Sequence, residues 1–260
     1  MNDIKVIFFD IDGTIYTHDT HVMIPSTVEA FYKLKENGYK ICIATSRCRS
    51  EVANMPSLFH DFDFDGYVFN GGASIYDHDT LIDAHYIPSK VIYKLIELQK
   101  EKAFDMRYAT DDSDFQHKKI TQEYLDVFFY LYLNVPVIKA YDNDLVPNIL
   151  LHGTHEVLEE VLKTLDDVSF VFDDKSVLEI TPLGVGKHLG IETLAKHWGY
   201  TMEQVMVFGD GFNDISMLKA AGVSIATGNA QQAAKDVANY VCKDIKEDGV
   251  YLFLKEQKMI

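Results

Sequence analysis

The stretch of sequence that decides the fold is Val6-Ile7-Phe8-Phe9-Asp10-Ile11-Asp12-Gly13-Thr14. Its four leading apolar residues form a short continuous run, which is typical of a strand buried on both faces in a parallel sheet. Asp10 and Asp12 would then lie at the carboxyl end of that strand, the edge where open α/β sheets bind their ligands. The alternative is a polar turn in which Asp12 and Gly13 only reverse the chain.

Short apolar strands and helices also alternate in the rest of the N-terminal part of the chain and in its C-terminal part. A helix is predicted from Pro25 to the Asn37-Gly38 pair, followed by an apolar strand over 40–44, and strand, helix and strand at this spacing indicate a βαβ unit. Further strands are predicted over 66–69, 204–209, 223–226 and 240–242, with a hairpin of 73–76 and 81–85 and helices over 187–197 and 250–258. Asn229 is expected to cap another helix.

The pattern changes between residues 84 and 183. Amphipathic helices are predicted over 90–101 and 156–165, and strands over 146–151, 169–172 and 177–180. Phe104 to Ala109 alternates like a half-exposed strand, and an aromatic-rich stretch over 124–133 is expected to belong to a core or an interface. We interpret this segment as an α+β module inserted into a doubly wound parallel-sheet domain.

The composition limits the possible partners and compartment. The chain has 260 residues, an apolar fraction of 47% and a net charge of -16, which argues against nucleic acid and anionic membranes as partners. No apolar run approaches the ~20 residues of a membrane span, and Asp3 before the first strand argues against a signal peptide. Three cysteines without metal-ligand spacing predict reduced thiols and a cytoplasmic protein.

Polar clusters end several of the predicted strands or begin the helices. Because parallel strands joined by right-handed crossovers point one way, these clusters can meet at one edge of the sheet. They are Asp10 with Asp12, Thr45 with Ser46, Lys187, and Asp210 with Asn213 and Asp214. Four carboxylates and one lysine leave an excess of negative charge, which a hard divalent cation such as Mg²⁺ would neutralise.

This combination of groups suits phosphoryl transfer. A carboxylate can act as the nucleophile and form an aspartyl-phosphate, and a second carboxylate two residues later can protonate the leaving oxygen and then deprotonate water. The hydroxyl and backbone N–H groups of Thr45 and Ser46 can bind phosphate oxygens at a helix start, and Lys187 supplies a positive charge to the same group. The predicted substrate is therefore a small phosphorylated metabolite.

The clusters resemble the four motifs, in order, of the haloacid dehalogenase superfamily. The matching residues are Asp10-Ile11-Asp12-Gly13-Thr14, Thr45-Ser46-Arg47, Lys187 and Gly209-Asp210-Gly211-Phe212-Asn213-Asp214. Further patches similar to its Cof-type phosphatase branch are Asn70-Gly71-Gly72, Gly228-Asn229-Ala230 and Asp248-Gly249-Val250. The resemblance implies a Rossmann-like catalytic core over 1–83 and 184–260, with residues 84–183 as an inserted α+β cap that sets substrate specificity.

The resemblance also implies roles for individual residues. Asp10 would be the nucleophile and Asp12 the acid and base. Mg²⁺ would be held by Asp10, the backbone carbonyl of Asp12 and Asp210, with Asp214 in support. Thr45 and Lys187 would bind the phosphoryl group, and Asn213 would orient either that group or Lys187. Because dehalogenase branches lack the second aspartate, the chain looks like a phosphotransferase. The leading hypothesis is a phosphatase for small phosphate monoesters, with sugar phosphates as the favoured class by resemblance.

Two positions depart from the family pattern. Ser46 replaces a common glycine and either donates a hydrogen bond or only fills a turn, and His188 replaces another glycine and is expected on the helix surface. Arg47 either contacts substrate or pairs with a surface acid. Asn70-Gly71-Gly72 is either a simple turn or a place where glycines let a substrate or the cap approach closely.

Other functions and assemblies stay open at this point. A phosphosugar mutase would use the same aspartyl-phosphate, and a non-catalytic binding or regulatory protein could share the fold. The chain is expected to be a monomer or a homodimer.

Overall fold

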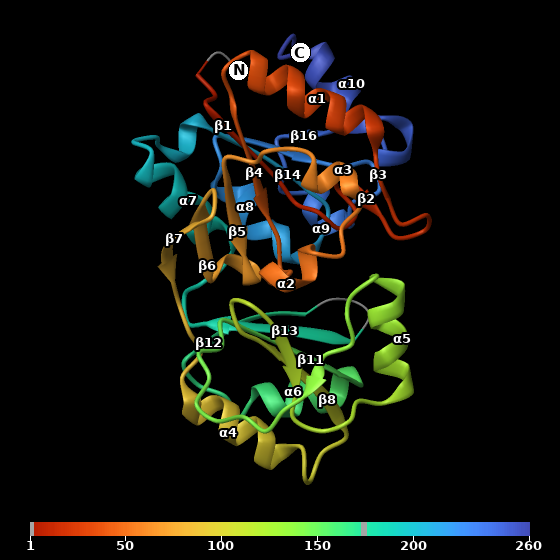
Figure 1. The fold of residues 1–260 in the computed structure, drawn as a ribbon, viewed down its shortest axis with the longest axis vertical. Coiled ribbons are helices and arrows are strands. Elements are labelled where there is room, and N and C mark those ends of the chain that lie inside the picture. Colours follow the sequence, from red (N-terminus) through yellow and green to blue (C-terminus); the bar gives the residue numbers. More distant parts are fainter. Residues whose placement is uncertain (1–2, 173–175) are drawn as a thin grey trace. The chain divides into compact units, whose positions relative to one another are not determined.

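The computed structural model describes residues 3–172 and 176–260, which form two compact units. The first contains Met1–Ser46, Met55–Asp83 and Gly186–Ile260, and the second contains Arg47–Asn54 and Ala84–Val185. The colours of Figure 1 show how each unit is assembled from segments that lie far apart in the sequence. Across the described residues, none of the helices is both long and apolar enough to cross a membrane.

The first unit is built on an eight-stranded sheet in the order β16-β15-β14-β1-β4-β5-β6-β7. The central strand β1 (Val6–Phe9) pairs in parallel with β14 and β4. The other strands are β4 (Lys40–Ala44), β5 (Gly66–Phe69), β6 (Ser74–Asp77), β7 (Thr80–Ala84), β14 (Val205–Gly209), β15 (Val223–Ala226) and β16 (Tyr240–Val241). Only the hairpin edge departs from parallel pairing, beginning where β5 meets β6.

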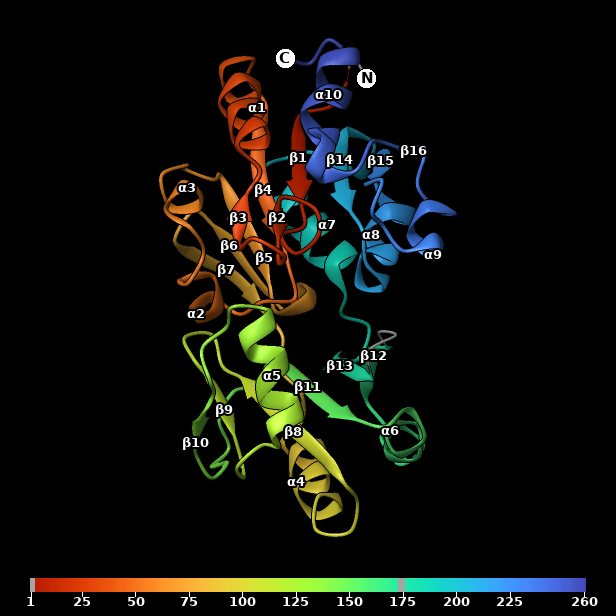
Figure 2. The same ribbon diagram turned by 90° about the vertical axis from the view of Figure 1, so that its right-hand side faces the viewer.

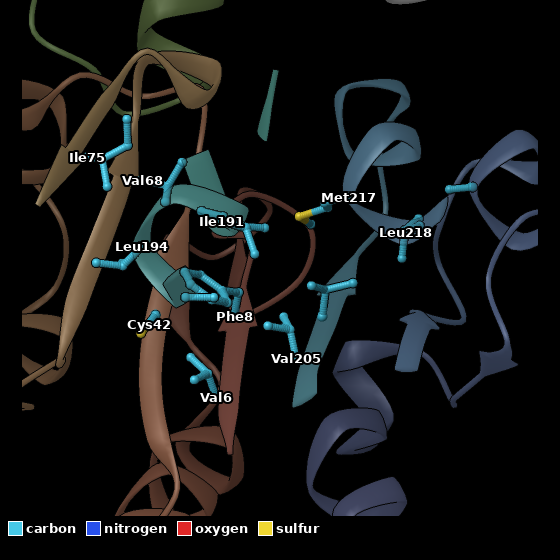
Figure 3. Packing of buried hydrophobic residues seen from close by; sticks show 14 of the residues in the cluster. Val6, Phe8, Cys42, Val68, Ile75, Ile191, Leu194, Val205, Met217 and Leu218 are labelled. Atoms are coloured by element: carbon cyan, nitrogen blue, oxygen red, sulfur yellow. The ribbon is translucent and has the colours of Figure 1, made fainter. Parts of the chain in front are cut away.

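Helices cover both faces of this sheet, as the doubly wound prediction requires. On one face, alternate residues such as Val6 and Phe8 pack against Ile191 and Leu194 of α7 (Lys187–His197) and against α8 (Ile215–Ala220), as Figure 3 shows. On the other face, the ring of Phe9 lies 4.8 Å from that of Phe31 in α1 (Pro25–Glu36). Phe208 likewise packs against Phe253 in α10 (Gly249–Glu256). The predicted α/β class with a parallel core sheet is confirmed.

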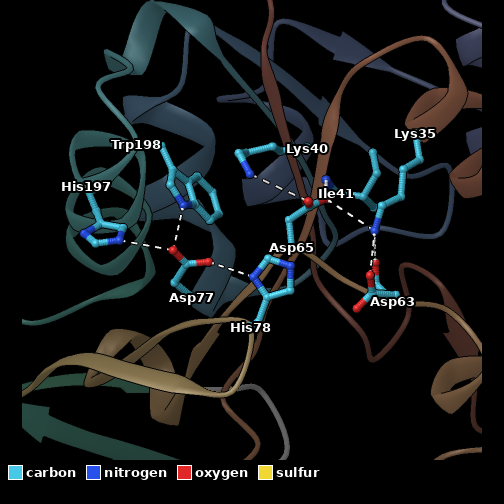
Figure 4. A network of polar contacts seen from close by, with 9 residues as sticks. All are labelled: Lys35, Lys40, Ile41, Asp63, Asp65, Asp77, His78, His197 and Trp198. Atoms are coloured by element: carbon cyan, nitrogen blue, oxygen red, sulfur yellow. Dashed lines mark hydrogen bonds and ion pairs between the residues drawn. The ribbon is translucent and has the colours of Figure 1, made fainter.

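Polar contacts fix the end of α7 against the hairpin (Figure 4). The Asp77 carboxylate accepts a hydrogen bond from the Trp198 indole at 3.1 Å and lies 3.1 Å from Nε2 of His197. Lys40 lies over the same indole, 4.4 Å from its centroid. The helix that begins with Lys187 is therefore anchored at its far end.

The second unit contains a mixed six-stranded sheet in the order β10-β9-β8-β11-β13-β12. Its strands are β8 (Phe104–Ala109), β9 (Asp114–Gln116), β10 (Val137–Ile138), β11 (Asn148–Gly153), β12 (Val168–Phe172) and β13 (Val177–Pro182). Its larger helices are α4 (Ser89–Leu98), α5 (Gln122–Tyr130) and α6 (His155–Leu162). An apolar cluster from β8, β11 and β13 packs with residues of α4 and α6.

The prediction that β8 is half exposed is wrong. All six of its residues are buried, because the polar positions that alternate with the apolar ones are buried among other polar groups. Arg107 pairs with Glu51 and donates to the Asn148 side chain at 3.0 Å. Glu51 belongs to α2 (Arg49–Val52), so this helix packs in the second unit although its segment, residues 47–54, follows Ser46 directly in sequence.

Two local expectations also need revision. Asn229 does not cap a helix, because α9 (Gln232–Lys235) begins later, after Gln231. The aromatic stretch is divided: Tyr124 and Phe128 are buried in α5, whereas Phe129 is exposed. The short hairpin β2 (Tyr16–Thr17) and β3 (Val22–Met23) was not predicted, because two-residue strands leave no periodicity.

Candidate active site

The parallel pairing of β1 with β14 brings two acidic segments together. Phe9 is in register with Phe208, and the backbone N–H of Asp10 donates to the Phe208 carbonyl at 3.0 Å. Asp10 and Asp210 therefore follow the ends of neighbouring strands and lie at the same edge of the sheet, although 200 positions separate them in the sequence. This is the convergence that the sequence analysis expected.

Lys187 joins this edge from the first residue of α7. Its Nζ lies 2.6 Å from Oδ1 of Asp10 and 2.6 Å from Oδ1 of Asp214, and the side chain is only 1% exposed. Burial alone would lower the pKa of Lys187, but the two carboxylates raise it above its usual range, so the ammonium stays charged. A fixed positive charge therefore lies directly against the Asp10 carboxylate.

The approach of α7 depends on the Asn70-Gly71-Gly72 segment, which forms the 3₁₀ turn η1. Gly72 has a φ of +109°, and a Cβ there would lie 2.2 Å from the carbonyl oxygen of Gly186. The backbone of η1 thus packs against the residue that immediately precedes Lys187. At this turn the group that approaches closely is the start of α7, rather than the substrate or the cap considered from the sequence.

Asp214 organises the loop after β14. Oδ1 bonds to Lys187, while Oδ2 accepts hydrogen bonds from the backbone N–H groups of Asp210 and Gly211 at 2.8 and 2.9 Å. The side chain is fully buried. Both of its oxygens are therefore engaged in holding the lysine and the loop.

Asp210 is oriented by Thr14. The Thr14 hydroxyl donates to Oδ1 of Asp210 at 2.8 Å, and a Cβ on Gly13 would lie 2.2 Å from Oδ2, so only glycine leaves room for the carboxylate. Burial, and then the charge of Asp214, raise the pKa of Asp210 to about 8, against the opposing effect of the Thr14 hydrogen bond. Burial and Asp214 also raise the pKa of Asp10 well above its usual range, although Lys187 opposes the rise.

These carboxylates fit a divalent metal ion. Asp10, Asp210 and Asp214 each offer an oxygen, and the three oxygens lie within 4.8 Å of one another. Burial and the neighbouring carboxylates raise the pKa values of Asp10 and Asp210, and Lys187 only partly offsets these effects. A hard cation with oxygen ligands would supply the missing charge.

Asp12 lies on the first turn after β1, with its side chain 30% exposed. Its Oδ1 is 3.2 Å from Nε2 of His18. The nearby Asn229 amide donates to the carbonyl of Gly13 at 2.7 Å and accepts from the N–H of Ile245. The loop that carries Asp12 is therefore held from two directions.

The remaining predicted residues divide between the two units. Asn213 donates from its amide to the Ser46 hydroxyl at 2.9 Å, and buried Thr45 continues β4 through its backbone bond to Val68. Arg47 instead belongs to the second unit, where its guanidinium donates to the backbone carbonyls of Glu51 and Leu131.

Sequence reasoning assigned no place in the site to Thr14, Asn229 or His18, although the first two lie inside recognised motifs. A hydroxyl directly after Asp-Gly is a detectable signal for Thr14. His18 carries no such signal, because its contact with Asp12 depends on the path of an unpredicted hairpin. His188 lies half-buried on α7.

Comparison with known proteins agrees with this geometry. A family model for haloacid dehalogenase-like hydrolases matches residues 7–254. The 5-amino-6-(5-phospho-D-ribitylamino)uracil phosphatase YitU of Bacillus subtilis is 26% identical over 264 residues, with 96% of each chain covered. The pyridoxal phosphate phosphatase YbhA of Escherichia coli is 28% identical over 274 residues, covering 96% of this chain and 97% of its own.

A solved structure extends the similarity to both units. The HAD subclass IIB sugar phosphatase BT4131 superposes with a TM-score of 0.92 at 29% identity, covering 98% of this chain and 100% of its own. The chain therefore belongs to the haloacid dehalogenase-like hydrolase family. Within that family it is a phosphatase of the Cof-type branch, subclass IIB, and its substrate is a small phosphorylated compound.

Proposed function

We propose that the protein is a Mg²⁺-dependent phosphatase that hydrolyses phosphate monoesters through an aspartyl-phosphate on Asp10, with sugar phosphates as the preferred class. The observation that carries the proposal is the buried contact between the Asp10 carboxylate and Lys187, beside Asp210 and Asp214. The choice of sugar phosphates is supported by the similarity to a subclass IIB sugar phosphatase.

The reaction takes two steps. In the first, a carboxylate oxygen of Asp10 attacks phosphorus, the bond from phosphorus to the ester oxygen breaks, and Asp12 gives its proton to the departing alcohol. In the second, Asp12 takes a proton from water, the water oxygen attacks phosphorus, and the bond from phosphorus to the Asp10 oxygen breaks. Inorganic phosphate leaves, and both carboxyl groups return to their starting states.

The other site residues hold the phosphoryl group. Lys187 neutralises its developing charge, and the hydroxyl and N–H groups of Thr45 and Ser46 donate to its oxygens. Asn213 orients Ser46 through the hydrogen bond between their side chains. Asp10, Asp210 and the backbone carbonyl of Asp12, with Asp214 in support, would hold Mg²⁺, which would supply charge neutralisation for the phosphate oxygens.

A hydrolysis screen tests this function. Wild-type protein is incubated with a panel of phosphorylated metabolites, with Mg²⁺ and with a chelator, and released inorganic phosphate is measured. Asp10→Asn should reduce release at least about a thousandfold, because the variant lacks the nucleophile. Asp61→Asn, which removes an exposed carboxylate, should retain full activity.

The same screen separates hydrolysis from phosphoryl transfer between positions of one sugar. A mutase would return the phosphoryl group to the sugar, so isomerised phosphosugar would accumulate without inorganic phosphate. That product, or full activity in Asp10→Asn, would contradict the proposal.

A further inference from the structure

His18 lies next to Asp12 but outside every motif discussed above. Its Nε2 is 3.2 Å from Oδ1 of Asp12, and its side chain is only 13% exposed. Because His18 directly follows β2 and precedes β3, its position depends on the short hairpin that these two strands form.

That hairpin holds the imidazole in place. The ring of Tyr16, which is itself buried, meets the ring of His18 edge-on with centroids 5.2 Å apart. The backbone N–H of Gly13 donates to the Tyr16 carbonyl at 3.0 Å, so the hairpin begins against the loop that carries Asp12. Asp19, the neighbour of His18, forms an ion pair with Lys246. These contacts hold the residue on both sides.

We propose that His18 is a positioning residue that orients the Asp12 carboxyl group for proton transfer. An N–H at Nε2 donates to Oδ1 of Asp12, which fixes the plane of the carboxyl group and hence the direction of its second oxygen. Either the neutral tautomer with hydrogen on Nε2 or the imidazolium provides this donor. This role rests on the proposed function, in which Asp12 protonates the leaving oxygen.

A positioning role makes a specific kinetic prediction. Proton transfer to the leaving oxygen matters most when the departing alcohol is a weak acid, and least when it leaves readily as an anion. A misplaced Asp12 should therefore slow the hydrolysis of esters of weakly acidic alcohols more than that of other esters. A loss of packing alone would slow the hydrolysis of all esters by the same factor.

The test compares kcat/KM for two esters of similar shape, p-nitrophenyl phosphate and phenyl phosphate, whose leaving phenols differ in acidity. This constant covers the steps up to formation of the aspartyl-phosphate, where the leaving oxygen is protonated. His18→Gln places an amide N–H near the position of Nε2, whereas the shorter His18→Asn does not reach it. The matched control is His21→Asn, since His21 contacts the Tyr16 hydroxyl.

We expect His18→Asn to lower kcat/KM for phenyl phosphate about tenfold more than for p-nitrophenyl phosphate, a fraction of the usual general-acid contribution. His18→Gln should restore most of the kcat/KM that is lost selectively with phenyl phosphate. His21→Asn should show no difference between the two esters in its effect on kcat/KM. An equal loss with both esters, or no loss, would overturn the role of His18 while leaving the proposed function intact. If wild-type protein hydrolysed neither ester nor any metabolite, the proposed function and this inference would both fail.

Discussion

Four ionisable side chains are packed together at the active site, and the balance of their charges explains much of its chemistry. Asp10, Asp214 and Lys187 are buried, and Asp210 lies beside them. Buried charges are stable only when they are paired and hydrogen-bonded. Burial and the neighbouring carboxylates raise the pKa values of Asp10 and Asp210 although Lys187 opposes the rise, and a bound cation would stabilise their charged forms.

Thr14 provides a direct test of how Asp210 is held. Thr14→Val keeps the shape of the side chain but removes the hydroxyl that donates to Asp210. We expect Mg²⁺ affinity to fall about 10- to 100-fold, as is usual when a hydrogen bond to a metal ligand is lost. Isothermal titration with Mg²⁺ measures this change. Thr14→Ser keeps the hydroxyl and should bind Mg²⁺ normally, and unchanged affinity in Thr14→Val would contradict the role of the hydroxyl.

The buried carboxyl group of Asp114, in the second unit, should make stability depend on pH. Burial raises the pKa of Asp114 to about 6, with a further rise from Glu51, although the guanidinium of Arg107 opposes it. Below about pH 4 the carboxyl is protonated in the folded and unfolded states alike. Between about pH 4 and 6 the unfolded state loses its proton first. The free energy of unfolding should therefore fall as pH rises, by roughly 3 kcal/mol for a shift of about two units.

Denaturant unfolding of wild type and Asp114→Asn from pH 4 to 7 tests this contribution. As pH rises, the free energy of unfolding of wild type should fall relative to that of Asp114→Asn. This relative fall should stop above about pH 6. Asp112→Asn removes an exposed charge two residues away and serves as the control. A constant difference across the range would contradict a buried, neutral Asp114.

At the scale of elements, the position of α7 determines where Lys187 lies. Its first residue is Lys187, its middle packs on the sheet through Ile191 and Leu194, and its end is anchored by Asp77. The start of the helix is set by the contact between Gly72 and Gly186. The glycines of η1 therefore belong to the structure of the active site.

Gly72→Ala should displace this helix start. The new Cβ would meet the Gly186 backbone, and alanine is disfavoured at a φ of +109°. Gly38→Ala is the matched control, because Gly38 has a φ of +86° with no atom within 4 Å of an added Cβ. We expect Gly72→Ala to lower the free energy of unfolding by about 1 to 3 kcal/mol more than Gly38→Ala, the usual cost of overpacking. If denaturant unfolding showed the same loss of unfolding free energy in both variants, the positive φ alone would account for the effect, and the contact with Gly186 would contribute nothing.

Over the whole molecule, metal binding should couple to folding of the first unit, because its ligands come from β1 and from the loop after β14. A cation that binds only the folded state stabilises it by about 2.7 kcal/mol at a hundred times its Kd. At about 2 to 4 °C per kcal/mol, saturating Mg²⁺ should raise Tm by roughly 5 to 10 °C. Thermal unfolding with and without Mg²⁺ measures the shift. It should disappear in Asp210→Asn, and no shift in wild type would contradict the metal site.

The second unit is the proposed source of substrate specificity. Exchanging it for the matching part of YbhA should transfer preference for pyridoxal phosphate, the substrate in that relative's name. The exchange should include residues 47–54 as well as 84–185, because the buried ion pair of Glu51 with Arg107 joins these segments. Relative kcat/KM over a substrate panel measures the outcome. A preference that stayed with the first unit would refute this assignment.

The sequence by itself determined the class of fold and the main chemistry of the site. Four-residue apolar runs ending in carboxylates predict buried parallel strands because such strands lack a solvent-facing side. Their common direction then predicts that Asp10 and Asp210 meet. The start of α7 at Lys187 was also predicted and is confirmed.

Only the tertiary structure decided which side chains touch. The pairing of Thr14 with Asp210 and of His18 with Asp12 depends on turns too short to leave a periodic pattern. The burial of β8 was mispredicted for a related reason: alternation along a strand records which side chains are polar, and cannot record that Glu51, from a distant segment, covers Arg107. Contacts between segments far apart in sequence are set by packing in three dimensions, which local sequence patterns do not encode.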